Sequence, residues 1–167
     1  MKKIYLAVLF LAMIIPLHAQ SKKELRKQRD KENYEKIKEL INSKNFVFEA
    51  DWASTQKGRR INLTTNPNYL KVKGDQVIAY MPYFGVAHTA IGYSGDAGIK
   101  FEDTPKNYSV HFNDKKYKVV VKFDARNKNE TFNVTMTIFK NGNASMNITS
   151  SGRNGINYDG KVEALKD

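Results

Sequence analysis

The sequence contains no cysteine, so no disulfide can stabilise the fold and no thiolate can bind a metal. A bacterial lipoprotein anchor is excluded as well, because it requires a cysteine at the point of signal cleavage. Histidine is scarce: only His88 and His111 follow the first twenty residues, and neither belongs to a metal-binding spacing. A hydrophobic core must therefore hold the chain together, and we predict no metal and no other cofactor.

Long apolar runs are also missing, apart from one at the start of the chain. Two lysines precede an apolar run from Ile4 to Leu17, which is too short to span a bilayer stably. We predict that residues 1–19 are a signal peptide, cleaved after Ala19 so that the mature chain begins at Gln20. The protein is then expected to be exported to the periplasm or beyond, soluble and without a transmembrane segment.

Positive charge is concentrated in one segment of the chain. The net charge is +11, and residues 21–44 alone carry nine Lys or Arg against five Asp or Glu. The remaining residues, 45–167, hold 17 basic against 12 acidic side chains, so the body of the protein is only mildly basic. We therefore predict no nucleic-acid partner.

Residues 20–44 are predicted to form a charged N-terminal helix. A capping-box pattern starts at Ser21, and no Gly or Pro interrupts the segment. Leu25 stands alone in a charged first half, whereas the second half has four apolar residues on one helical stripe. These four are Tyr34, Ile37, Leu40 and Ile41. We expect only the second half to dock on the domain; a membrane-surface or nucleic-acid arm is the alternative.

From Asn45 onward apolar residues recur at every second position, which is typical of strands with one face on a core. The first run alternates Phe46, Phe48, Ala50 and Trp52. Short strands joined by tight turns predict a mostly β fold, with a single antiparallel β domain over residues 45–167. We predict a meander closed into a barrel of about eight strands, with a side-chain core or room for one small ligand.

Three turns can be assigned because directly paired residues share one face of a sheet. A two-residue turn at 74–75 and a four-residue loop over 113–116, which pairs Phe112 with Tyr117, each bring apolar residues opposite one another. In the last hairpin only a three-residue loop ending at Gly142 does so, which predicts a left-handed Gly142.

One long connection, from Tyr80 to Phe101, departs from the pattern of strands and turns. It is too apolar to be disordered, and it combines aromatic and small residues with one histidine and one aspartate. We expect a glycine-bent segment that plugs one end of the barrel; the functional alternative is a flap or pocket wall. The candidate ligand-binding residues are Trp52, Tyr80, Tyr83, Phe84, His88, Tyr93 and Asp96.

Nucleophile and phosphate-binding motifs are absent from the sequence. The serine of Gly92-Tyr93-Ser94-Gly95 does not form a nucleophile elbow, and the nearby glycines lack the Lys-Ser/Thr pair of a phosphate loop. His111 alternates with apolar neighbours and is expected to face solvent. We predict no catalytic residues, although a hydrolase using His88 with Asp96 remains a hypothesis that requires the two side chains within hydrogen-bond reach.

Several short motifs resemble one known family. They are Tyr83-Phe84-Gly85, Tyr93 with the run from Asp96 to Phe101, and Tyr158-Asp159-Gly160. Together they resemble the domain-of-unknown-function 4251 family of small exported proteins in Bacteroides-type bacteria, over nearly the whole mature chain. The resemblance implies a lipocalin-like β fold in the cell envelope, and it implies no activity.

Two functions therefore stand ahead of the hydrolase hypothesis. The first is an exported binding module for a small apolar or amphipathic molecule or for a segment of a partner protein. The second is a structural or accessory protein of the cell envelope, with a filled barrel and the basic helix as its contact element. A cavity lined by Trp52, Tyr80 or Tyr83 would favour the first, and a filled core the second. Ligand, partner and oligomeric state are not predicted.

Overall fold

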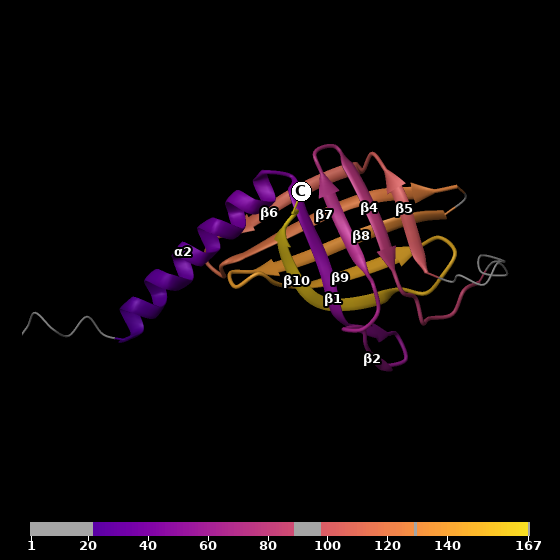
Figure 1. Cartoon of the computed structure of the whole chain (residues 1–167), viewed down its shortest axis with the longest axis horizontal. Coiled ribbons are helices and arrows are strands. Elements are labelled where there is room, and N and C mark those ends of the chain that lie inside the picture. Colours follow the sequence, from indigo (N-terminus) through magenta and orange to yellow (C-terminus); the bar gives the residue numbers. More distant parts are fainter. Residues whose placement is uncertain (1–21, 89–97, 129, 167) are drawn as a thin grey trace, which may run out of the picture.

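A computed structural model of the chain describes residues 22–88, 98–128 and 130–166. The predicted signal peptide, Gln20, Tyr93 and Asp96 lie outside the described residues. One helix projects from one end of a large sheet (Figure 1). The elements are α2 Lys22–Asn42, β1 Asn45–Thr55, β2 Arg60–Asn62, β3 Tyr69–Lys73, β4 Gln76–Met81, β5 Ile99–Asp103, β6 Lys106–Asn113, β7 Lys118–Asn127, β8 Glu130–Phe139, β9 Asn143–Ser150 and β10 Ile156–Ala164.

The sheet consists of two meanders joined through the first and the last strand. Its order is β5-β4-β3-β1-β10-β9-β8-β7-β6, with β2 paired to β1, and the pairings are antiparallel. Strands β1, β4 and β5 cross the direction of β6–β9, and β10 curves between the two groups (Figure 1). The predicted mostly β class with one preceding helix is therefore confirmed. The described sheet has ten strands where about eight were predicted: β5 begins inside the predicted connection from Tyr80 to Phe101, and β10 has no predicted counterpart.

The strands curl into an open half-barrel, and the predicted closure into a lipocalin-like barrel is not confirmed. Strands β5 and β6 are the two ends of the strand order. Strand β5 is linked to β7 through side chains: the Arg126 backbone N–H donates to Asp103 Oδ2 at 2.8 Å, and Asn127 Nδ2 donates to the Lys100 carbonyl at 2.6 Å. Isolated side-chain hydrogen bonds thus take the place of the backbone ladder that would close a barrel.

The interior of the half-barrel is filled by side chains. Successive side chains of a strand point to opposite faces of the sheet, so every second residue of each strand points inward. The inward side chains of all the strands form one continuous apolar cluster. The largest fully buried side chains of the strands include Phe46, Phe48, Phe123, Phe132 and Tyr158. The described interior is therefore a packed core.

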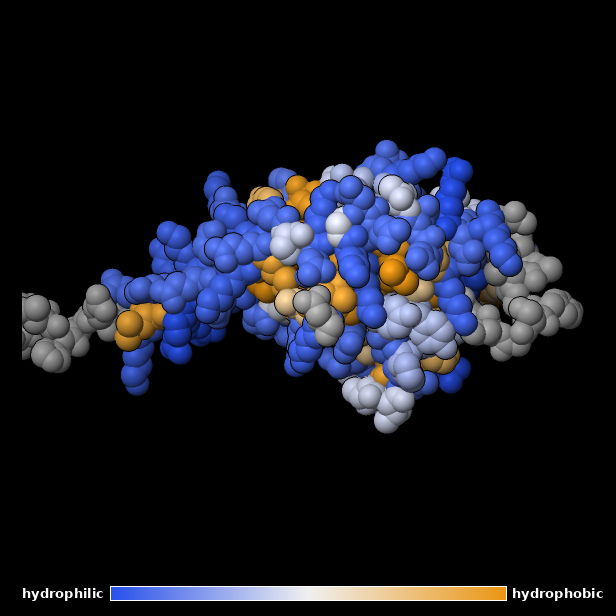
Figure 2. All heavy atoms as spheres, turned by 45° about the horizontal axis from the view of Figure 1, so that its top comes forward, coloured by the Kyte–Doolittle hydropathy of each residue, from blue (hydrophilic) through white to orange (hydrophobic). Residues whose placement is uncertain are grey.

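Helix α2 docks by its second half, as predicted. Tyr34, Ile37 and Ile41 are buried, whereas Leu25 in the first half is 46% exposed. The Tyr34 ring lies 5.5 Å from the Tyr117 ring, and its hydroxyl donates to Asp114 Oδ1 at 3.0 Å. On the side seen in Figure 2 the part of α2 away from the sheet presents an almost entirely hydrophilic surface. The apolar stripe thus anchors one end of the helix and leaves the other in solvent.

Substitution of Ile37 tests this division of the helix. We expect Ile37→Asp to lower the free energy of unfolding by about 3 kcal/mol, because it puts a carboxylate into the apolar contact. Leu25→Asp is the matched control and should change it by less than about 0.5 kcal/mol. Urea denaturation followed by circular dichroism measures both, and equal effects would contradict the division.

The Tyr34 hydroxyl predicts a loss of stability at alkaline pH. Burial, together with the hydrogen bond to Asp114, raises the pKa of Tyr34 from 10.0 to about 12. As the pH rises, the unfolded chain therefore loses the Tyr34 proton before the folded chain does. The contribution of the protonated hydroxyl to the free energy of unfolding is complete below pH 10 and disappears as the pH rises toward 12. In chemical denaturation between pH 9 and 11.5, Tyr34→Phe should show a shallower decline than the wild type; parallel declines would contradict the assignment.

Two hairpins have the predicted register and one differs. Gly74 and Gly142 both have positive φ, and Met136 pairs with Met146 across a three-residue loop, as expected. The loop between β6 and β7 instead covers residues 114–117, so that Phe112 pairs with Val119 and not with Tyr117. Tyr117 has a φ of 49°, which places it in the loop. In the loop, the Tyr117 ring contacts Tyr34 of α2, which is a tertiary interaction. The register of β6 and β7 differs from the predicted one by two residues, so every side chain stays on its predicted face.

Candidate functional site

A β-bulge in β1 decides where the single tryptophan points. The register with β10 shifts between Ala50 and Trp52, so Asp51 is an extra residue on β1. After the bulge Ala53 is buried, while Trp52 lies half-buried on the outer face of the sheet. The sequence prediction that Trp52 continues the inward row of Phe46, Phe48 and Ala50 is therefore wrong.

Gly160 on β10 permits the close approach of the two strands at this bulge. A Cβ atom at position 160 would lie 1.9 Å from the Glu49 carbonyl oxygen and 2.7 Å from the Ala50 Cα. Both neighbours are backbone atoms and cannot rotate away. Only glycine therefore fits opposite the bulge that turns Trp52 outward.

A short strand fixes the tryptophan ring. Strand β2 pairs with β1 so that Trp52 is opposite Asn62. Its first residue, Arg60, sits with its guanidinium 4.6 Å from the centre of the Trp52 ring. Arg60 also lies 4.0 Å from Asp159, but both side chains are at least half exposed, so this ion pair contributes little. The stacking on the ring holds the aromatic surface in place.

A second exposed aromatic side chain lies on β8. Phe139 is 44% exposed at the end of this strand, immediately before the β8–β9 loop. The following residue, Lys140, forms an ion pair with Asp30 of α2, and both side chains are partly buried. The helix thus supports the loop that carries this edge of the site.

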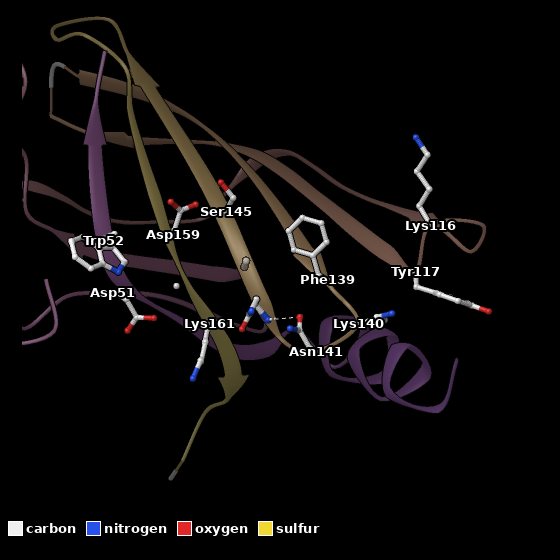
Figure 3. Close-up of a pocket in the computed structure, with 13 residues that line it drawn as sticks. Asp51, Trp52, Lys116, Tyr117, Phe139, Lys140, Asn141, Ser145, Asp159 and Lys161 are labelled. Carbon is white, nitrogen blue, oxygen red and sulfur yellow. Dashed lines mark hydrogen bonds between the residues drawn. The ribbon is translucent and has the colours of Figure 1, made fainter. Parts of the chain in front are cut away.

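Between the two aromatic side chains lies a groove of about 610 Å³. Figure 3 shows Trp52 and Phe139 on opposite sides of Asp159 and Ser145, which come from β10 and β9. Buried Ala144 and Gly160 contribute to its floor, and polar side chains surround it. Its lining is completed by Asp51, Lys116, Tyr117, Lys140, Asn141, Asn143 and Lys161. Its volume falls within the range of small-molecule pockets, and it combines two aromatic side chains with several polar groups.

The other candidate residues lie elsewhere. Tyr80 is 36% exposed on β4, with its ring centre 6.1 Å from that of Tyr69. Tyr83 is buried and Phe84 is exposed; with Tyr80 they line a smaller cavity of about 250 Å³. Trp52 does not line this cavity. The predicted set is therefore divided between two places, and Tyr93 and Asp96 lie outside the described residues.

Residues 82–88 are fastened to the segment that precedes β10. Ala87 forms a backbone bridge with Arg153, and His88 Nε2 lies 2.6 Å from Asn154 Oδ1. The Tyr83 hydroxyl is 2.9 Å from the Asn154 carbonyl and 3.0 Å from that of Val86, and can donate to either. Burial raises the pKa of Tyr83. These contacts hold the first part of the predicted connection against residues 152–154.

A buried ion pair under this segment was not predicted. Arg153 Nε lies 2.7 Å from Glu130 Oε1 and Nη2 lies 2.8 Å from Oε2, with both side chains at most 6% exposed. Ser150 Oγ also donates to Glu130, and the Arg153 guanidinium lies 4.9 Å from the Tyr83 ring centre. A signal was available: Glu130 falls on the same face as Phe132 and Val134, where a carboxylate requires a buried partner.

The described residues offer neither a metal cluster nor a membrane-spanning helix. Within residues 22–88, 98–128 and 130–166 no three His, Cys, Asp or Glu side chains are grouped as a metal would require. In the same part of the chain no helix has the length and hydropathy to cross a bilayer. His111 is exposed, as expected.

Comparison with known proteins decides the family. The family model described as "Domain of unknown function (DUF4251)" matches residues 28–162. The chain belongs to this family. A crystal structure of a DUF4251 family protein from Bacteroides eggerthii DSM 20697 superimposes with a TM-score of 0.62 at 17% sequence identity, covering 81% of this chain and 89% of that one. The predicted family is therefore confirmed, and the DUF4251 fold is shared at low identity. No curated protein matches the chain.

Proposed function

We propose that the protein is an exported binding module, soluble in the periplasm or outside the cell after signal cleavage, and that the groove between Trp52 and Phe139 is its ligand site. The observation that carries the proposal is the pair of partly exposed aromatic side chains on opposite sides of a 610 Å³ groove. Large side chains left exposed around a concave surface are characteristic of binding sites. The proposal requires no closed barrel, because the ligand lies on the outer face.

The way the groove is built also supports binding. The bulge at Asp51, the glycine at position 160 and the stacking of Arg60 all act to hold one tryptophan on the outer face. Local departures from regular structure of this kind are concentrated at functional sites.

Trp52 is the only tryptophan of the chain, so its fluorescence reports on the groove alone. We expect a low-molecular-mass fraction of an envelope extract from the producing bacterium to shift or quench Trp52 emission. The response should be saturable, and Phe139→Ala should weaken it about tenfold. Tyr80→Ala, which removes a comparably exposed aromatic side chain outside the groove, should leave it unchanged. A missing response, or one lost in Tyr80→Ala only, would contradict the proposal.

An accessory protein of the cell envelope is the second candidate. The filled interior and the hydrophilic start of α2 favour it, because residues 22–29 are all exposed and present charged side chains at the surface. For this candidate, deleting residues 22–28 should abolish binding to that partner, and no extract fraction should change Trp52 emission even in the full mature chain. The groove proposal predicts a Trp52 response in the same deletion variant, so the two candidates are separable.

A further inference from the structure

The outer face beside the groove is polar but mostly uncharged. Across β8, β9 and β10, Thr137 pairs with Ser145, Thr135 with Asn147, and Asn147 with Asn157. Asn147 Nδ2 donates to Asn157 Oδ1 at 2.8 Å, so these side chains support one another. Hydroxyl and amide groups both donate and accept hydrogen bonds. The face therefore presents both hydrogen-bond donors and hydrogen-bond acceptors, and these side chains carry no net charge.

Charges in the groove nearly balance, although the protein is basic. The charged side chains of the lining are two acidic ones, Asp51 and Asp159, and three basic ones, Lys116, Lys140 and Lys161. Lys140 is paired with Asp30 of α2, and Arg60 lies beside Asp159. A site for a polyanion would gather Lys and Arg without carboxylates. The excess of basic residues that gives the chain a net charge of +11 is thus not concentrated in this groove. A neutral ligand fits the groove better than a polyanion does.

The register sets the length of the site. Trp52 is opposite Asp159, Asp159 is opposite Ser145, and Ser145 is opposite Thr137, two residues before Phe139. The two aromatic residues are therefore three inter-strand spacings apart, about 14 Å across the sheet. This span exceeds a single sugar ring and accommodates a short chain of them.

We infer that the groove binds a neutral oligosaccharide laid across β1, β10, β9 and β8. This rests on the proposed function. Sugar rings stack their apolar C–H faces on Trp52 and Phe139, and their hydroxyls exchange hydrogen bonds with Asp159 and Ser145 between them. An extended peptide is disfavoured because it adds to a free sheet edge, whereas this groove crosses the middle of the sheet.

Affinity gel electrophoresis in the presence of neutral polysaccharides tests the inference on the full mature chain. The probes are dextran, laminarin, xylan and galactomannan, with heparin and polygalacturonate as anionic comparisons. We expect retardation by at least one neutral polysaccharide that persists at 0.5 M salt, because no net charge drives it. Binding to the anionic polymers alone, or to none of the six, would overturn the inference.

Variants locate the binding. Phe139→Ala and Trp52→Ala should each weaken retardation about tenfold, while Trp52→Phe, which keeps an aromatic ring, should lose less. Asp159→Asn keeps a hydrogen-bonding side chain and should retain most binding to a neutral sugar; Tyr80→Ala is the control outside the groove. Unchanged retardation in both groove alanine variants would overturn the inference.

One further measurement separates this inference from the proposed function. If the envelope extract shifts Trp52 emission, periodate oxidation of the extract, which cleaves vicinal diols of sugars, should remove the activity, and protease treatment should not. The opposite result would leave the groove as a binding site and overturn the oligosaccharide as its ligand. An extract without any effect on Trp52 would instead count against the proposed function itself.

Discussion

Replacing Glu130 with alanine is expected to lower the free energy of unfolding by about 3–5 kcal/mol, because it leaves the buried guanidinium of Arg153 without its carboxylate. The pair is bidentate and nearly excluded from water. Its loss also removes the acceptor for Ser150 Oγ. Since the total stability of a domain is about 5–15 kcal/mol, the loss should be large in urea denaturation followed by circular dichroism.

The double variant Glu130→Leu with Arg153→Met is the control for this prediction. It removes both charges and keeps apolar volume, so it should recover most of the lost stability. If the single variant does not fold, recovery in the double variant still provides the test. A Glu130→Ala protein that loses less than about 1 kcal/mol would contradict the role given to the pair.

The second large effect is expected for Gly160→Ala. Its new Cβ would lie 1.9 Å from the Glu49 carbonyl oxygen, so β1 and β10 would have to separate at the bulge. We expect a loss of about 3 kcal/mol in the free energy of unfolding, together with a shift of Trp52 emission, because the bulge sets the orientation of the ring.

Gly58→Ala is the matched control for Gly160→Ala. Gly58 has a φ of +79°, but a Cβ there would meet no atom within 4 Å. Its replacement should therefore cost only about 1 kcal/mol of left-handed strain and leave Trp52 emission unchanged. Equal costs at the two positions would contradict the steric explanation.

Most of the fold could be predicted because its signals are local. The stripe of Tyr34, Ile37 and Ile41 predicted which half of α2 docks, and alternation predicted which strand residues are buried. The register around Gly142 followed from matching faces, since a shift of one residue would expose an entire row. A shift of two residues, as in the loop that contains Tyr117, leaves the faces unchanged and could not be detected.

The candidate site was predicted less well because it depends on partners that are distant in sequence. The outward turn of Trp52 requires Gly160, more than one hundred residues later, to admit the bulge. Phe139 is not among the predicted ligand-binding residues, because nothing local indicates that it faces Trp52 across a groove. Glu130 carried a signal of its own, but its partner Arg153 lies in an irregular segment without a pattern.

Periodicity and turn chemistry act between near neighbours, so they specified the helix, most of the strands and the inward and outward rows of those strands, but neither β5 nor β10. Short motifs indicated the family. Three further features depend on contacts between distant strands: β5 and β6 leave the half-barrel open, a bulge places Trp52 on the outer face, and Trp52 and Phe139 flank one groove. These features arise where strands from both meanders meet, and the energy of such contacts depends on the geometry of both partners at once.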